Sequence, residues 1–174
     1  MTKTLNDSAA PSTSLPPLPP VRRRWLPPLW LFVAAGLVFL FCYPAVLIGR
    51  SMMMAVYLRE ADDAYNAGDL NGAADYFSSA MGLSSANEEP YSKRWQIALQ
   101  TGDLESALGD FASAVDDHPS ASLPYCYRGQ AYRELELYEQ AIPDYEACIN
   151  NTPNNVWRSL APSALQNVKK KLGE

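Results

Sequence analysis

The sequence predicts an all-α protein in which an N-terminal transmembrane helix precedes a solenoid of helix-turn-helix units. Three segments of 34 residues follow one another without insertion, and they carry Gly68-Asp69-Leu70, Gly102-Asp103-Leu104 and Glu136-Leu137-Tyr138 at the same position. An alanine, an aromatic residue and a small residue then follow at fixed offsets. One such unit cannot bury its apolar face alone, so this period is typical of stacked helix pairs.

The residues at the fixed offsets resemble the pattern of tetratricopeptide repeats. In chain order they are Tyr57, Ala61, Ala73, Phe77 and Ala80; Tyr91, Ala98, Ala107, Phe111, Ala114 and Pro119; and Tyr125, Gly129, Tyr132, Ala141, Tyr145 and Pro153. The resemblance implies three repeats and a capping helix. The expected segments are a Pro-rich tail over 1–24, a transmembrane helix over 25–50, a repeat region over 51–155 with repeats at about 54–87, 88–121 and 122–155, and the capping helix over 156–174.

Three departures from the family pattern predict local differences. Trp95 is bulky where a small residue normally lets the two helices of a repeat approach each other. Glu60, Arg94 and Arg128 replace the usual leucine, which predicts less apolar contacts between neighbouring first helices. Pro143 lies inside the second helix of the third repeat, where a missing amide and a steric clash predict a distortion.

An uncharged run from Trp25 to Gly49 precedes the repeats, and it is apolar almost throughout from Trp30 to Ile48. At about 1.5 Å per residue, such a helix crosses a hydrocarbon core of roughly 30 Å. A cleaved signal peptide is the alternative, but the run is longer than a signal core and lacks a small-x-small exit. Residues 51–58 are compatible with helix, so the anchor can continue into the first repeat.

The charges flanking this run predict its orientation. Arg22, Arg23 and Arg24 precede it, whereas Arg50 and Arg59 follow it. The positive-inside rule therefore places the N-terminus in the cytoplasm and the repeats across a bacterial inner membrane or an organelle membrane, with the inverted orientation as the alternative. The tail over 1–24 is too polar and Pro-rich to fold alone, and is expected to be a disordered spacer or, alternatively, a polyproline ligand.

The charge distribution argues against nucleic acid as a partner. The net charge is −5, yet beyond Arg50 acidic residues outnumber basic ones by 18 to 9. An acidic repeat region repels phosphate backbones and anionic lipid headgroups. It indicates either simple solubility or a preference for basic protein partners.

No residue pattern predicts an enzyme, a metal site or a cofactor. His118 is the single histidine, and Asp116-Asp117-His118 is expected to be a polar turn in preference to a cation site. No phosphate-binding loop or zinc-spaced Cys/His set is present. Cys148 takes the place of a packing alanine. Helix geometry predicts that Cys126 faces the groove, with a disulfide to Cys148 as the alternative.

The family resemblance implies that the first helices line a concave groove for a protein partner. The expected lining residues are Leu58, Asp62, Tyr65, Asn66, Gln96, Leu99, Gln100, Cys126, Gln130, Arg133 and Glu134. The lysines with which some members grip carboxylates are absent, because Leu58, Ser92 and Cys126 occupy that offset. Tyr65 and Leu99 are expected to receive apolar anchors of the partner, unless they only cover neighbouring helices.

These expectations predict a membrane-anchored adaptor that binds a protein partner and supports recruitment or assembly of a membrane or envelope complex. The alternative is a fixed accessory subunit of a large membrane complex, in which the transmembrane helix is itself an interface.

Overall fold

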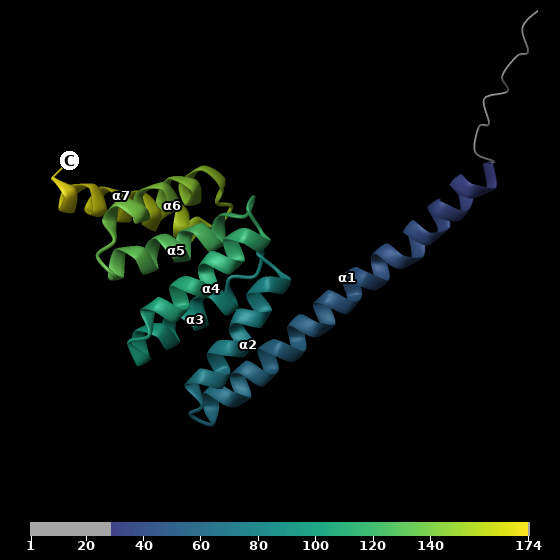
Figure 1. Ribbon diagram of the computed structural model, residues 1–174, viewed down its shortest axis with the longest axis horizontal. Helices are drawn as coiled ribbons and strands as arrows, with labels where there is room; N and C mark the ends of the chain where they lie inside the picture. Colours follow the sequence, from purple (N-terminus) through teal and green to yellow (C-terminus); the bar gives the residue numbers. More distant parts are fainter. Residues whose placement is uncertain (1–28, 174) are drawn as a thin grey trace, which may run out of the picture. The chain divides into compact units, whose positions relative to one another are not determined.

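Seven α-helices make up the part of the chain that the structure describes (Figure 1). This computed structural model describes the backbone of residues 29–173 and the side chains of residues 46–173. The helices are α1 (Leu29–Asn66), α2 (Leu70–Leu83), α3 (Glu89–Thr101), α4 (Leu104–Asp117), α5 (Ser122–Glu134), α6 (Tyr138–Asn151) and α7 (Asn155–Leu172). The prediction of an all-α helical solenoid is confirmed.

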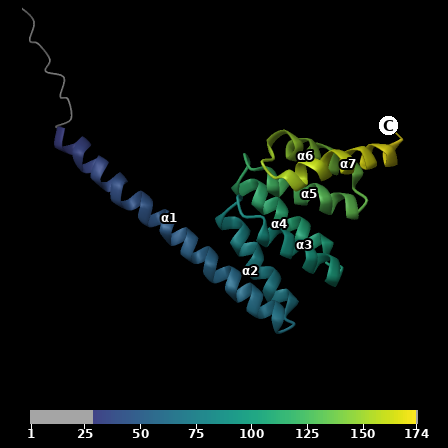
Figure 2. The same cartoon turned by 180° about the vertical axis from the view of Figure 1, so that it is seen from behind.

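The 34-residue period of the sequence reappears in the helices. The second helices of the three repeats, α2, α4 and α6, begin at Leu70, Leu104 and Tyr138 and have 14 residues each. Each repeat pairs a first helix with a second one, and the contacts of α2 with α3, α4 with α5, and α6 with α7 join successive pairs. Figures 1 and 2 show α2 to α7 stacked in this order from opposite sides.

The core consists of small and aromatic residues that recur with the period. A first cluster joins α1, α2 and α3 through Ala61, Ala73, Phe77 and Ile97. A second cluster extends from Met81 at the end of α2 through α3 to α7, and it contains Tyr91, Trp95, Phe111, Tyr127, Tyr145 and Trp157 together with repeat alanines. Alanine at these offsets has no side chain beyond Cβ, so the helices can approach each other closely and bury the aromatic rings.

The packing of the two helices within a repeat depends on the residue at one position of the 34-residue pattern, which is Ala61, Trp95 or Gly129 in the three repeats. At this offset Gly129 lies so close to α6 that an added Cβ would stand 3.2 Å from the Asp144 Cβ and 3.4 Å from a Tyr145 ring carbon. The second repeat has Trp95 here, and its ring packs against Phe111 instead. Accordingly, α5 and α6 contact each other more extensively than α3 and α4 do. A bulky residue at this position therefore holds the two helices apart.

Both α6 and α7 contain an internal proline. α6 starts at Tyr138 and runs unbroken through Pro143 to Asn151, so the expected distortion neither delays nor interrupts this helix. Pro162 lies inside α7 in the same way. The ends of α7 are well capped: Asn154 accepts hydrogen bonds from the amides of the first turn, and three lysines near Gly173 complement the helix dipole.

α1 is continuous from Leu29 to Asn66, so no linker separates the apolar N-terminal run from the first repeat. The transmembrane segment expected over 25–50 lies mostly outside the residues whose side chains are described, and the tail over 1–24 lies wholly outside the described part. Among the described residues, no helix combines the length and the hydropathy needed to cross a membrane.

The turns inside the repeats show why glycine recurs there. Gly68 and Gly102 have φ values of 82° and 79°, and Glu136 takes the left-handed conformation at the same position with a φ of 60°. Asp69 and Asp103 then cap the second helices by accepting hydrogen bonds from Gly72 N and Ser106 N, whereas Leu137 offers no side-chain cap. The third turn therefore carries a strained residue and lacks a cap.

Restoring the Gly-Asp pair at this turn is expected to stabilise the protein. Glycine accepts positive φ without steric cost, and an aspartate at the N-cap typically contributes about 1 kcal/mol. The double substitution Glu136→Gly/Leu137→Asp should therefore raise the free energy of unfolding by about 1 to 2 kcal/mol, measured by urea denaturation.

The matched control makes the opposite exchange in the second repeat. Gly102→Glu/Asp103→Leu should lower the free energy of unfolding by a similar amount. Because hydrogen bonds from Ser106 lower the pKa of Asp103, the contribution of that cap is present at neutral pH and fades as the pH falls through the lowered pKa. A restored turn that leaves stability unchanged would show that Glu136 is not strained.

Candidate functional site

The expected groove residues lie on α1, α3 and α5, and they differ in how accessible they are. Asn66, Gln96, Leu99, Gln100 and Glu134 are exposed. A second group, Leu58, Asp62, Tyr65, Gln130 and Arg133, is half-buried. Cys126 is fully buried.

The two expected apolar anchors differ from each other. Leu99 is 54% exposed on α3 and is available for contact. Tyr65 packs against the first core cluster, and the ammonium group of Lys93 lies 5.5 Å from the centre of its ring. The ring of Tyr65 is therefore partly covered by contacts within the protein, so Leu99 is the stronger candidate for a partner contact.

Cys126 does not face the groove as expected. It forms a disulfide with Cys148 that joins α5 to α6, with the two Cα atoms 5.0 Å apart. Both cysteines belong to the second core cluster. The small size of the residue at each position lets these two helices lie close enough for the bond, and the sequence pattern alone favoured the other orientation.

A pocket of about 300 Å³ extends the groove toward the C-terminus. Gln130 and Arg133 of α5 form one wall, and Trp157, Leu160, Ser163, Ala164 and Asn167 of α7 form the other, with Tyr145 also in the lining. Leu160 is 53% exposed at this site. The structure thus brings two of the expected residues, Gln130 and Arg133, together with α7, the helix that the sequence predicts only as a cap.

Electrostatics at this pocket are set by Arg133 and Tyr145. The guanidinium group of Arg133 donates a hydrogen bond of 2.5 Å to Glu134, its neighbour in sequence. The hydroxyl of Tyr145 is buried and has no hydrogen-bond partner among the described atoms. Burial raises the pKa of Tyr145 to about 12. The pocket offers a guanidinium and amide groups beside apolar surface, which suits a peptide segment.

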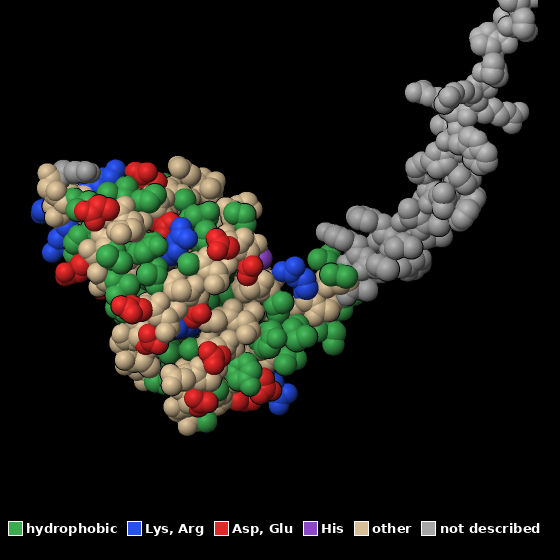
Figure 3. Space-filling view, in the orientation of Figure 1, with side chains coloured by type: hydrophobic (Ala, Val, Ile, Leu, Met, Phe, Trp, Pro, Cys, Tyr) green, Lys and Arg blue, Asp and Glu red, His purple; other side chains and the backbone are tan. Residues whose placement is uncertain are grey.

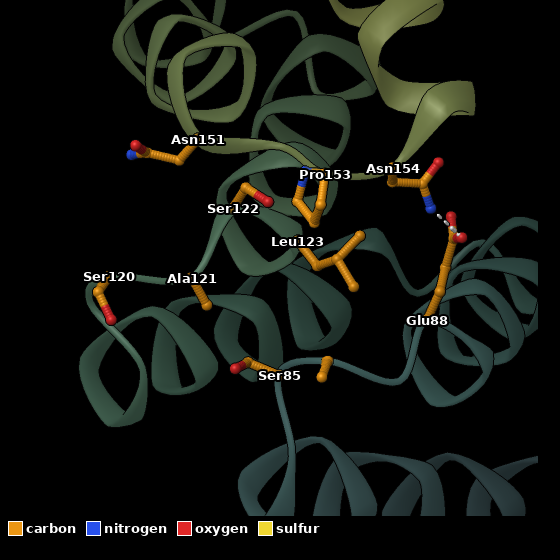
Figure 4. Close-up of a pocket in the computed structure, with 10 residues that line it drawn as sticks. Ser85, Glu88, Ser120, Ala121, Ser122, Leu123, Asn151, Pro153 and Asn154 are labelled. Atoms are coloured by element: carbon orange, nitrogen blue, oxygen red, sulfur yellow. Dashed lines mark hydrogen bonds between the residues drawn. The ribbon is translucent and has the colours of Figure 1, made fainter.

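A second pocket, of about 530 Å³, lies along the loops that join successive repeats (Figure 4). The carboxylate of Glu88 accepts hydrogen bonds from the Tyr127 hydroxyl at 3.1 Å, the Trp157 indole at 3.0 Å and the Asn154 amide at 2.5 Å. The donors come from the third repeat and from the start of α7. Glu88 is therefore already engaged as a structural link, and the other residues that line this pocket are uncharged.

The acidic turn at the end of α4 has a structural contact. A ring nitrogen of His118 lies 3.2 Å from the carbonyl oxygen of Gly82 at the end of α2. Among the described residues, no three His, Cys, Asp or Glu side chains converge as a metal site would require.

Comparison with solved structures identifies the fold. The TPR domain of Arabidopsis OM64 is 23% identical, with a TM-score of 0.52, and the match covers 70% of this chain and 98% of that domain. The first TPR of Spaghetti (RPAP3), solved with the HSP90 peptide SRMEEVD, is 23% identical with a TM-score of 0.54, over 71% of this chain and 96% of that one. The TPR2B domain of yeast Sti1, in complex with an Hsp70 peptide, is 14% identical with a TM-score of 0.54, over 69% and 98%.

No protein-family model and no curated protein sequence matches the chain. The similarity to the three solved domains shows that this chain has the tetratricopeptide repeat fold, as the repeat pattern predicted.

Proposed function

We propose that this protein is a membrane-anchored adaptor that binds a segment of a protein partner in the groove of α1, α3 and α5, extended by α7. The observation that carries the proposal is the presence of two exposed leucines, Leu99 on α3 and Leu160 on α7, of which Leu160 lines the pocket with Arg133. Solved domains of the same fold carry peptides of HSP90 and Hsp70, which supports peptide binding as the use of this fold.

The chemistry of the lining defines the kind of segment that fits. The lysines of a carboxylate clamp are absent, since Leu58, Ser92 and the buried Cys126 occupy those offsets. Aliphatic or aromatic side chains of the partner would cover Leu99 and Leu160. Polar groups of the segment would meet Gln130 and Arg133.

Two observations support repeats that lie across the membrane from a cytoplasmic N-terminus. Arg22, Arg23 and Arg24 precede the uncharged run, as the positive-inside rule requires for this orientation. The disulfide between Cys126 and Cys148 fits an oxidising compartment, where such bonds persist. In spheroplasts, external protease should digest the repeats and leave a short anchor, whereas protection of the repeats would reverse the orientation.

The groove is tested by truncating its most exposed anchor. After the partner is trapped by crosslinking in the native membrane and identified, Leu99→Ala should weaken its binding by about 1 to 3 kcal/mol while the melting temperature stays unchanged. Leu160→Ala should act in the same direction. The matched control is Leu137→Ala, because Leu137 is a partly exposed leucine at a turn outside the groove.

Unchanged binding in both groove variants would contradict the proposed site. In that case the function as a fixed accessory subunit, which binds through its N-terminal helix, becomes the better account. The apolar surface of α1 is the observation that favours this second function.

A further inference from the structure

α1 displays an exposed apolar face just before it joins the first repeat. Hydrophobic side chains gather on this described part of the helix (Figure 3). Their exposed fractions are 60% for Val46, 50% for Leu47, 59% for Ile48, 66% for Met52, 48% for Met53 and 52% for Val56. Monomeric water-soluble proteins rarely leave such a continuous apolar surface uncovered.

The helical period separates one part of this surface from the side of α1 that packs on the repeats, whereas Leu47 lies three turns before Leu58 on the packing side itself. Ile48, Met52 and Val56 are spaced by four residues and therefore lie along one side of the helix. Leu58 and Ala61 face the first core cluster instead. We call Ile48, Met52, Met53 and Val56 the apolar stripe.

The apolar stripe ends abruptly in charge. Arg59 and Asp63 continue the same side of the helix, and they form an ion pair of 3.9 Å with side chains that are 81% and 69% exposed. The surface therefore changes from apolar to charged within one helical turn after Val56. Such a boundary is typical of a helix that passes from a lipid environment into water.

Arg50 does not interrupt the apolar stripe, although it lies within the same stretch of α1. Its guanidinium group donates a hydrogen bond of 2.7 Å to the carbonyl oxygen of Leu83, at the end of α2. A cation at this place complements the carbonyl end of the α2 dipole. The side chain thus turns toward the repeats and ties α1 to α2, which leaves the opposite side of α1 uniformly apolar.

We propose that the apolar stripe lies in the interfacial layer of the same bilayer that holds the anchor. This inference rests on the membrane anchor of the proposed function. Val56 lies seven residues beyond Gly49, where the uncharged run ends. Seven residues of helix span about 10 Å, which matches the depth of the layer where apolar faces meet headgroups and the upper acyl chains.

This placement orients the first repeat on the membrane. Arg50 holds the end of α2 near the interfacial layer, while the turn at Gly68 lies about 25 Å farther along α1. The loop after Leu83 therefore faces the lipid, and the turn at Gly68 faces away from it. A partner segment would reach the groove while it is close to the membrane surface.

Spin-label accessibility in the full chain tests this inference. Nanodiscs of phosphatidylethanolamine and phosphatidylglycerol hold the protein with Cys42→Ser and the disulfide between Cys126 and Cys148 intact. Single labels are placed by Met52→Cys and Val56→Cys, with Asp63→Cys as the matched control on the same side of α1. The ratio of collision with oxygen to collision with a water-soluble nickel chelate should be several-fold higher at Met52 and Val56 than at Asp63.

Two results would overturn the inference. Ratios at Met52 and Val56 equal to that at Asp63 would place the apolar stripe in water. Low collision with both reagents would show that protein covers it, and spin-spin broadening would identify that protein as a second copy of the chain. Failure of the unlabelled chain to co-purify with nanodiscs is a separate observation, and it would contradict the membrane anchor of the proposed function itself.

Discussion

Replacing Phe111 by alanine is expected to lower the free energy of unfolding by about 3 to 5 kcal/mol. Phe111 is fully buried in the central repeat, and its ring centre lies 5.6 Å from that of Tyr127 and 6.3 Å from that of Tyr91. Removing the ring leaves a cavity between three helices, and the aromatic neighbours lose their contacts. The loss is a large share of the 5 to 15 kcal/mol that is typical of a domain.

Urea denaturation of the chain from Met54 onward, followed by circular dichroism, measures this loss. Tyr76→Ala is the control, because Tyr76 lies on a second helix with 36% of its surface exposed. It should cost less than about 1 kcal/mol. A Phe111→Ala variant as stable as this control would mean that the core is not organised around the repeat aromatics.

Replacing Arg128 by leucine is expected to cost about 3 to 5 kcal/mol, as breaking a buried ion pair typically does. Arg128 donates two hydrogen bonds of 2.7 Å to the carboxylate of Asp144, whose side chain is 4% exposed. These hydrogen bonds raise the pKa of Arg128. Without the guanidinium group, the carboxylate remains inside the third repeat with no opposite charge, and that uncompensated charge accounts for most of the loss.

A double substitution separates this penalty from loss of packing. Arg128→Leu/Asp144→Leu removes both charges and should recover most of the stability, because a buried ion pair and an apolar pair of similar size contribute comparably. Lys169→Leu is the control, since its ion pair with Glu146 is exposed and should contribute less than about 1 kcal/mol. Equal losses in the single and the double variant would contradict this account.

The sequence by itself determined the helical solenoid and its register. Glycine is favoured where the turn needs positive φ, as at Gly68 and Gly102, and an aspartate after it caps the next helix. The small and aromatic residues repeat with the helix pairs. These signals are local, because each depends on the backbone of a few neighbouring residues, and so they can be read without knowledge of the rest of the chain. The capping lysines before Gly173 belong to the same class.

Only the tertiary structure decided which polar groups meet. Arg94 and Arg128 were expected to alter contacts between neighbouring first helices, yet each pairs with an aspartate 16 residues later, on the second helix of its own repeat. Glu88 finds its three donors 39 to 69 residues away. Arg50 reaches Leu83 across 33 residues. No spacing rule in the sequence predicts such partners.

Some features of the candidate groove can also be predicted from the sequence, whereas others depend on the tertiary structure. Its position on the first helices follows from the repeat, but the disulfide of Cys126, the packing of Tyr65 and the wall contributed by α7 depend on how each helix is rotated about its axis. That rotation is the result of all side chains packing at once. A few degrees decide whether a residue at the edge of a helix face points into the core or into the groove.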